Sequence, residues 1–411
     1  MLNFPVVLYF PYPSVGGVSV LFLRVAKLLS ESHQIILMDY VDGYMAKNLP
    51  EGVEFLDCNK KEQVPSDSII IFQGVYPWRI KDINLFPSTC RVLFWHLHPD
   101  NYFPYYKYKY IKHKILKYIC YSISFLKHRI GKKLIKELLS KNALVFMDQP
   151  NRDSTSKYFK LNLEEKNYLK IFTDDSENIR EIINLNVEDD YFHFGWIGRL
   201  EDFKSPILLH TLDRLKDVCN TKFEFTIIGN GKDSEEFNKY RDSCTCYKIN
   251  IIDEIRPDEI SSYISNFDIL FAMGTSALEG AKIAIPTILL DYSYQPINNI
   301  YRYQLIYEKH GFSLADPISK YNFEDVCTLQ KKISFILENY DNISQNCRSY
   351  WDTNFSPSVF KSDFLNTIQK SNLSINDLTT AEYHKPDVVT KILFKIYGNR
   401  IVGNSSKAWQ Y

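Results

Sequence analysis

The sequence predicts an α/β protein with two domains, each a parallel sheet with helices on both faces. Short apolar runs of strand length recur along the chain, and segments with helical spacing lie between them. Alternating strands and helices of this kind form parallel sheets. A polar, acidic stretch near the middle divides the runs into two series. We therefore expect one domain at 1–175, a linker at 176–190 and a second domain at 191–345.

The composition is ordinary for a soluble globular protein. Of the 411 residues, 45% are hydrophobic and 24% are charged, and this length fits two or three domains. The formal net charge is zero, which provides no global field for nucleic acid. Eight cysteines are scattered without the spacing of a metal site or a disulfide framework. The chain has no apolar run of membrane-spanning length and no signal-peptide pattern, so we expect a cytoplasmic protein.

The first domain is expected to carry a glycine loop. Its strands are predicted at 5–10, 34–39, 68–72, 91–96 and 143–147. Gly16 and Gly17 follow the first strand and precede a helix predicted over 19–30. Glycines at a helix N-terminus favour a bound anion, although a glycine pair also occurs in ordinary turns. His96 and His98 stand at the end of another strand, where a ligand-binding role and a structural role are both open.

The stretch 105–141 differs in composition from the rest of the first domain. It holds eleven Lys and Arg residues against one acid, Glu137, with tyrosines and aliphatic residues among them. Basic helices of this type bind anionic membrane surfaces, and the same charges could bind RNA or form a solvated helix face. Because no RNA-binding motif accompanies the charges, we favour membrane contact over nucleic acid.

The second domain is expected to begin with residues 191–215, around which the predicted site is built. A strand predicted over 191–197 breaks at Gly198, and a polar turn with Arg199 and Lys204 leads into a helix near Pro206. Ligands of open parallel sheets bind at the carboxyl ends of strands. An Arg fork and a Lys point charge there suit a diphosphate, with two solvated surface cations as the alternative.

Two more turns follow strands of the second domain. The remaining strands are predicted at 223–228, 247–251, 268–273 and 283–290. Gly229 and Asn230 follow the first of these. Thr275 and Ser276 stand at a helix N-terminus, where amides and hydroxyls suit a phosphate. Glu279, one turn further on, could accept hydrogen bonds from a ribose diol or simply complement the positive helix end.

Together these elements resemble the retaining GT-B glycosyltransferases of glycosyltransferase family 4. The resemblance covers 6–291 and is stronger in the second domain. It rests on Gly198-Arg199-Leu200 with Lys204, Gly229-Asn230-Gly231, Leu278-Glu279-Gly280 followed by Ile285-Pro286-Thr287, and the glycine loop Gly16-Gly17-Val18. It implies two Rossmann-like domains whose parallel sheets face each other across a cleft. Part of the C-terminal segment, 346–411, would cross back to the N-terminal domain.

The resemblance also implies roles for individual residues. Arg199 and Lys204 would bind the donor diphosphate and stabilise the leaving group, and His98, or else His96, would reach the donor sugar. Glu279 would hold the donor ribose. The implied catalytic residues are Arg199, Lys204 and His98. The implied donor-binding residues are Gly16, Gly17, Gly198, Gly229, Asn230, Thr275, Ser276 and Glu279.

One position departs from the family pattern. Many members carry a second glutamate eight residues before the ribose-binding one, and this chain has Phe271 there. The missing acid usually lies against the donor sugar, so the change bears on which sugar is used. The family needs no metal, and the chain has no Asp-x-Asp triplet.

The implied function is transfer of a sugar from a UDP- or GDP-sugar to a glycan or lipid-linked acceptor. We expect this in bacterial surface polysaccharide synthesis (lipopolysaccharide O-antigen or capsule), at the inner face of the inner membrane. The sequence shows no pair of carboxylates of the kind that a double-displacement mechanism uses. Front-face attack, which also retains the anomeric configuration, therefore fits better. Two alternatives stay open: a GT-B enzyme of another type, such as a nucleotide-sugar epimerase, and a catalytically silent membrane-associated partner, which only Phe271 supports.

The C-terminal part is expected to be helical. Helices are predicted over 323–340, 358–370 and 385–400, the last of them basic and amphipathic. This last helix could contact a membrane surface or pack on the body of the protein.

Overall fold

The computed structural model divides the chain into two compact units. The first holds residues up to Ile171 together with those from Phe360 on, and the second runs from Phe172 to Val359. The described residues are 4–99, 101–102, 114–164, 167–175, 191–218, 222–253, 255–256, 259–297, 301–318 and 328–385. The predicted linker, most of the helix predicted over 385–400 and the first part of the basic stretch lie outside them.

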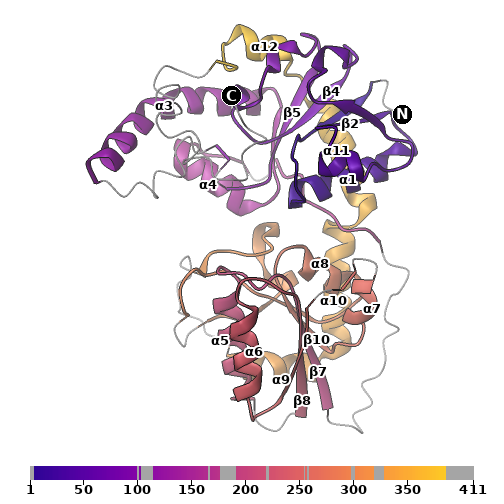
Figure 1. The fold of residues 1–411 in the computed structure, drawn as a ribbon, viewed down its shortest axis with the longest axis vertical. Coiled ribbons are helices and arrows are strands. Elements are labelled where there is room, and N and C mark those ends of the chain that lie inside the picture. Colours follow the sequence, from indigo (N-terminus) through magenta and orange to yellow (C-terminus); the bar gives the residue numbers. More distant parts are fainter. Residues whose placement is uncertain are drawn as a thin grey trace. The chain divides into compact units, whose positions relative to one another are not determined.

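The first unit is built on a six-stranded sheet in the order β3-β2-β1-β4-β5-β6 (Figure 1). All of its strand pairs are parallel. The strands are β1 (Val6–Tyr9), β2 (Ile35–Asp39), β3 (Glu54–Asp57), β4 (Ile69–Gln73), β5 (Arg91–His96) and β6 (Leu144–Phe146). Strand order reverses between β1 and β4, which is where ligands bind in such sheets.

Helices cover both faces of this sheet (Figure 1). They are α1 (Gly17–Ser30), α2 (Tyr44–Lys47), α3 (Lys114–Ser140), α4 (Gln149–Phe159), α11 (Pro357–Lys370) and α12 (Ile375–Thr380). On one face, Trp95 of β5 stacks on Phe22 of α1 and on Phe360 of α11, with ring centres 6.4 Å and 5.7 Å apart. On the other face, Leu138 of α3 and Phe159 of α4 join the buried core. The first turns of α3 project beyond the sheet.

The C-terminal segment belongs to the first unit through backbone contacts as well. The amide of Val92 donates to the carbonyl of Leu373 at 2.8 Å, and the amide of Ile375 donates to Cys90 at 2.9 Å. The unit is therefore assembled from two stretches of chain that are far apart in sequence.

The second unit has a six-stranded sheet in the order β12-β11-β10-β7-β8-β9. Its strands are β7 (Tyr191–Ile197), β8 (Lys222–Ile228), β9 (Lys248–Ile252), β10 (Ile269–Ala272), β11 (Thr287–Leu289) and β12 (Gln304–Leu305). All pairs are parallel except β11 with β12. The order reverses between β7 and β10. The helices are α5 (Ser205–Leu215), α6 (Ser234–Ser243), α7 (Ile260–Ile264), α8 (Thr275–Lys282), α9 (Leu329–Glu338) and α10 (Tyr340–Asn354).

The second unit begins earlier than the predicted domain start. The indole of Trp351 on α10 donates to the Thr173 hydroxyl at 2.8 Å, and the amide of Thr173 donates to Phe355 at 3.3 Å. The residues just before the predicted linker are thus held on the second unit.

The predicted fold class, two α/β domains on parallel sheets, is confirmed, with several corrections at the level of elements. The strand predicted over 283–290 is wrong in its first half, because α8 runs to Lys282 and Ala284 takes a φ of +61°. The helix predicted over 323–340 ends at Glu338 and is followed by the unpredicted α10. Strand β3 was also missed, because its sequence, Glu-Phe-Leu-Asp, has no apolar run. That the two sheets face each other stays a prediction.

Within the described ranges, no helix has both the length and the apolar character needed to cross a bilayer.

Candidate functional site

Two turns interlock at the carboxyl ends of β7 and β8. The amide of Gly198 donates to Ile228 at 3.0 Å, and the amide of Leu200 donates to Asn230 at 2.9 Å. A Cβ atom on Gly229 would overlap the carbonyl oxygen of Gly198, so the two backbones can approach this closely only because Gly229 lacks a side chain. The predicted residues Gly198, Gly229 and Asn230 are therefore brought together.

The same double turn holds two cations. The Nζ atom of Lys204 folds back towards Gly198 and lies 5.9 Å from the ring centres of Trp196 and Phe203. Burial, followed by repulsion from nearby Arg199, lowers the pKa of Lys204 to about 8. The Arg199 contribution shows that the two cations repel each other at this turn, and an anion bound there would relieve that repulsion.

Arg199 lies on the solvent side of this turn. Its side chain is 71% exposed, and its guanidinium pairs with Glu201 at 2.9 Å. Glu201 also opposes the lowering of the Lys204 pKa, so one carboxylate serves two cations. The turn holds two cations and two carboxylates, Glu201 and Asp202, so the diphosphate predicted for it would be bound by the individual cations and not by a net charge.

The neighbouring strand supplies a helix N-terminus at the same edge. Strand β10 pairs with β7 in parallel, and only Met273 and Gly274 separate it from α8. Gly274 has a φ of +67°, which favours glycine, and its amide donates to Leu314 at 2.8 Å. Thr275 is exposed and Ser276 is half-buried in the first turn of α8, whose first amides have no partner within the helix. This geometry suits a phosphate group.

Glu279 lies further along α8 and is largely buried, with 8% of the residue exposed. Its carboxylate forms an ion pair with the ammonium of Lys282 on the same helix. The Nζ atom of Lys282 also donates to the carbonyl of Asp174 at 3.3 Å. The sequence predictions did not include Lys282, although a lysine three residues after a helical glutamate is a recognisable pairing signal.

Phe271 is a core residue and does not lie at the ligand-contacting position that its spacing from Glu279 implied. It lies within β10, is fully buried, and packs against Phe194 and Phe225 with ring centres 6.2 Å and 5.7 Å away. The position eight residues before Glu279 is therefore in the core of the sheet. Counting eight residues back from Glu279 therefore aligns a core residue of this chain with the acid of the family pattern.

In the first unit, the glycine loop sits at the end of β1. The amide of Gly16 donates to the Ser19 hydroxyl at 3.0 Å, and a Cβ on Gly17 would meet no atom within 4 Å. Asp39, which the sequence predictions did not include, fixes this loop by accepting the amides of Tyr12 and Met45, both at 2.9 Å. The sequence feature that could have identified Asp39 is an acid at the carboxyl end of a predicted strand.

The two predicted histidines have different surroundings. His96 is fully buried against Tyr102 and Phe146, and burial lowers its pKa to about 3. Its Nδ1 lies 3.2 Å from the Thr155 hydroxyl, so it is a neutral core residue rather than the ligand contact considered as an alternative. His98 is exposed in the turn after β5.

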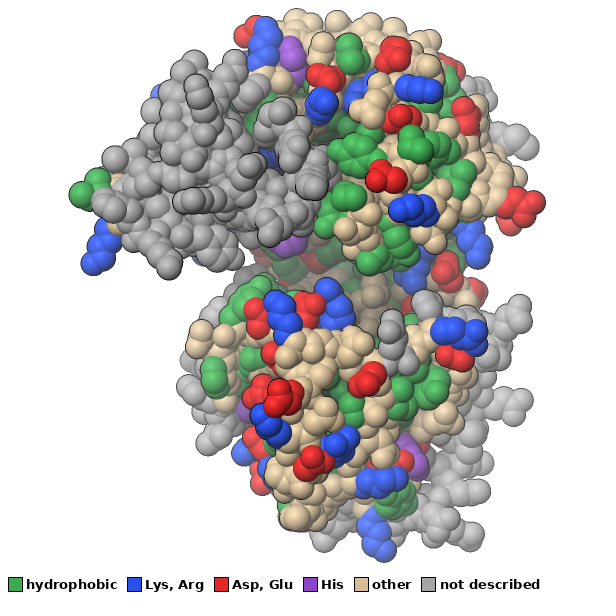
Figure 2. Space-filling model, viewed as in Figure 1, with side chains coloured by type: hydrophobic (Ala, Val, Ile, Leu, Met, Phe, Trp, Pro, Cys, Tyr) green, Lys and Arg blue, Asp and Glu red, His purple; other side chains and the backbone are tan. Residues whose placement is uncertain are grey.

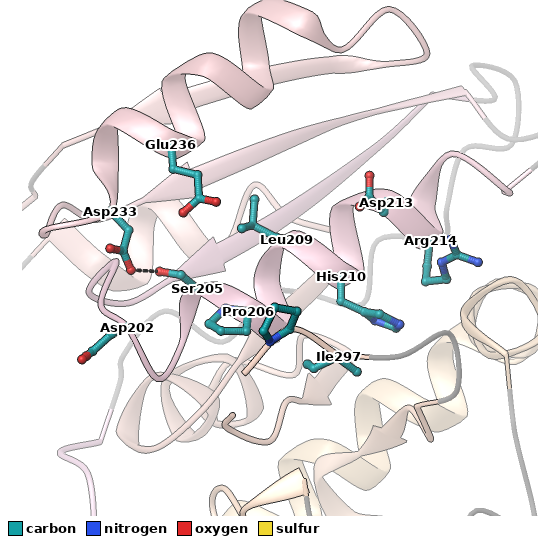
Figure 3. Close-up of a pocket in the computed structure, with 11 residues that line it drawn as sticks. Asp202, Ser205, Pro206, Leu209, His210, Asp213, Arg214, Asp233, Glu236 and Ile297 are labelled. Carbon is teal, nitrogen blue, oxygen red and sulfur yellow. Dashed lines mark hydrogen bonds between the residues drawn. The ribbon is translucent and has the colours of Figure 1, made fainter. Parts of the chain in front are cut away.

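A pocket of about 330 Å³ lies beside α5 and contains none of the predicted site residues (Figure 3). Four carboxylates line it, Asp202, Asp213, Asp233 and Glu236, and the Ser205 hydroxyl donates to Asp233 at 2.5 Å. Carboxylates repel a diphosphate, so this pocket does not suit the predicted donor. In the part of the chain that the structure describes, no group of three or more His, Cys, Asp or Glu residues is placed to hold a metal ion.

The visible surface has no large patch of one charge. Acidic and basic side chains are interspersed among the coloured residues of Figure 2.

Comparison with known proteins identifies the fold. No family model and no curated protein sequence matches the chain. A solved glycosyltransferase from Rickettsia africae is 14% identical with a TM-score of 0.55, covering 90% of this chain and 99% of that one. The Anabaena protein HepE, solved with UDP and glucose, is 11% identical with a TM-score of 0.53, covering 89% and 100%.

A third solved structure is similar to the same extent. The lipopolysaccharide outer core galactosyltransferase WaaB, in its apo form, is 10% identical with a TM-score of 0.53, covering 90% of this chain and 99% of its own. The fold is GT-B. At these identities the likeness establishes the fold, and the GT-B fold carries more than one chemistry.

Proposed function

We propose that this GT-B protein is a retaining glycosyltransferase that moves a sugar from a nucleotide-sugar donor to a glycan or lipid-linked acceptor. The observation that carries the proposal is the edge of the second sheet. There the Arg199 and Lys204 turn, the Gly229 turn and the N-terminus of α8 end three adjacent strands. Two cations and a helix N-terminus at one edge suit a diphosphate, and Glu279 suits a ribose.

The proposed chemistry is front-face displacement. The bond between the anomeric carbon and the donor phosphate oxygen breaks, and the acceptor hydroxyl oxygen bonds the same face of that carbon. The acceptor proton passes to the departing phosphate oxygen. Arg199 and Lys204 stabilise the charge on that leaving group, and Thr275 and Ser276 orient it. His98 would contact the donor sugar, and Gly16 and Gly17 would leave room for the donor. No metal is assigned a role.

The neighbours support a nucleotide-sugar donor and a surface-polysaccharide role. HepE was solved with UDP and glucose, and WaaB is named as a lipopolysaccharide galactosyltransferase. We therefore propose a UDP- or GDP-sugar as donor and an acceptor of the lipopolysaccharide O-antigen or capsule type.

Helix α3 supports a peripheral position at an anionic membrane surface, which we propose as the inner face of the bacterial inner membrane. Ile115 and Tyr118 on α3 are 67% and 73% exposed. Lys114, Lys133 and Lys136 on the same helix are exposed as well. Exposed apolar and aromatic groups beside cations are the combination that anionic lipid surfaces bind.

The test is thermal stabilisation of the full chain by UDP-, GDP-, ADP- and CMP-sugars. A ligand that binds only the folded protein raises the melting temperature. A shift with one donor, lost in both Arg199→Ala and Glu279→Ala, is the expected result. No shift with any donor would overturn the proposal and favour the silent-partner alternative. A free sugar product formed without acceptor would instead indicate an epimerase.

A further inference from the structure

We propose that Lys282 is a positioning residue that orients the Glu279 carboxylate towards the donor ribose and thereby sets the preference for ribonucleotides. The proposal rests on the function proposed above. The two side chains form an ion pair within α8, and they are only 8% and 11% exposed, for Lys282 and Glu279 respectively. Burying one of these charges without the other would be strongly unfavourable, so the pair acts as a unit.

Lys282 is itself held from two directions. Its ammonium donates to the carbonyl of Asp174 at 3.3 Å, and its own carbonyl accepts a hydrogen bond from the guanidinium of Arg348 on α10. Arg348 is fixed in turn by Asp352, at 3.0 Å. The lysine is therefore anchored at its backbone and at its tip, unlike a surface lysine with a free rotamer.

Lys282 lies farther from the proposed phosphate site than Glu279 does. It is the last residue of α8, whereas Glu279 lies one turn nearer to the helix N-terminus and to the sheet edge with Thr275. The ammonium contacts Oε2 of the carboxylate and so restricts where that oxygen can lie. The Glu279 side chain keeps 11% of its surface exposed, and a carboxylate has about four acceptor sites on two oxygens, so the ion pair is compatible with ribose hydroxyls as further partners. Orientation of that acceptor is what Lys282 would supply.

The experiment compares UDP and GDP with their 2′-deoxy and 3′-deoxy forms, measured by calorimetric titration. Wild-type protein should prefer the ribonucleotide by about tenfold or more, because a hydrogen bond to a buried charged group is lost in a deoxy form. Lys282→Met should abolish most of that preference. Lys282→Arg should retain it, since the cation and its partners persist.

The control is Lys332→Met. Lys332 is also a buried lysine of the second unit, 7% exposed and paired with Glu308 at 3.0 Å. It should lose stability but keep the ribose preference, which separates positioning from simple stabilisation. If Lys282→Met fails to fold, Lys282→Ala, which also removes the donor and leaves room for water beside Glu279, takes its place.

The outcomes distinguish this inference from the proposed function. A ribose preference that survives in Lys282→Met or Lys282→Ala would overturn the inference and leave the donor site standing. Binding without any ribose preference in wild-type protein would remove Glu279 from the ribose and overturn the inference alone. Wild-type protein that binds neither nucleotide would overturn both.

Discussion

The carbonyl oxygen of Gly198 occupies the space that a Cβ atom on Gly229 would need. The contact is repeated one step along, where a Cβ on Gly231 would overlap the carbonyl of Leu200. The turn with Gly229 and Gly231 therefore supports the turn that carries Arg199. A substitution that moves one turn should also move the other.

Gly231→Ala should lower stability by about 1–3 kcal/mol, because the added methyl group has no space beside Leu200. It should also weaken donor binding by moving the cation turn. Urea unfolding and donor titration measure the two effects. Gly17→Ala is the matched control for stability, since its methyl group would meet no atom within 4 Å. Equal stability of both variants would contradict the interlocking of the turns.

Donor affinity should fall as the pH rises through about 8. Lys204 has a lowered pKa of about 8 in the free protein, and only its protonated form attracts the diphosphate. Affinity should be constant below that pH and decline above it. Arg199→Gln removes one cause of the lowering, so the decline should start at higher pH although binding is weaker. Titration of a UDP- or GDP-sugar from about pH 6 to 9 measures this, and an onset unchanged by Arg199→Gln would refute the coupling.

His96 should make the protein less stable in acid. Its pKa is lowered to about 3 in the folded protein, whereas an unfolded histidine titrates near about 6.5. Between these values the unfolded chain holds the extra proton, so stability falls as pH falls, by at most about 1.4 kcal/mol per pH unit. His96→Phe should flatten this slope, measured by urea unfolding at several pH values. His98→Ala should weaken donor binding and keep most of the slope, because burial is the main cause of the lowered His96 pKa.

Phe271→Glu should destabilise the protein by several kcal/mol, because it places a carboxylate among Phe194 and Phe225. It should not increase transferase activity. Phe271→Leu is the control and should cost about 1 kcal/mol. Thermal melts and donor turnover test both points. A stable Phe271→Glu variant with higher activity would show that this position does reach the donor.

Charge reversal on α3 should weaken membrane binding. Lys133 and Lys136 are exposed, and each cation near an anionic surface contributes about 1 kcal/mol. Lys133→Glu with Lys136→Glu should therefore reduce binding to phosphatidylglycerol vesicles at least about tenfold, measured by co-sedimentation. Lys331→Glu with Lys370→Glu changes two exposed lysines elsewhere and should have little effect. Equal losses in both pairs would assign the effect to net charge alone.

The sequence could predict what local patterns determine. The strand ending at Gly198, the cations behind it and the proline of the next helix are all short-range signals, and β7 and α5 follow them closely. His96 and His98 look alike in the sequence because the burial of His96 depends on Phe146 of β6 and Thr155 of α4, which are distant in sequence.

Other features depended on three-dimensional context. Spacing along the chain does not reveal whether a position lies in a strand or in a loop. Spacing therefore aligns Phe271, which lies in a strand, with a glutamate that contacts the donor sugar. The ion pair of Glu279 with Lys282 was readable in principle. Its anchoring by Asp174 and Arg348 was not, because those contacts join residues 108 and 66 positions away from Lys282.

The stacking of Phe360 on Trp95 has a consequence for synthesis on the ribosome. The first sheet is completed by side chains that are translated only after the whole second unit, from Phe172 to Val359. Proteins usually fold their N-terminal domain first as the chain emerges. In this chain the later-starting unit can finish first, while the indole of Trp95 waits uncovered on one side. The part of the protein that is made earliest therefore keeps apolar surface exposed until the part that is made last has been translated.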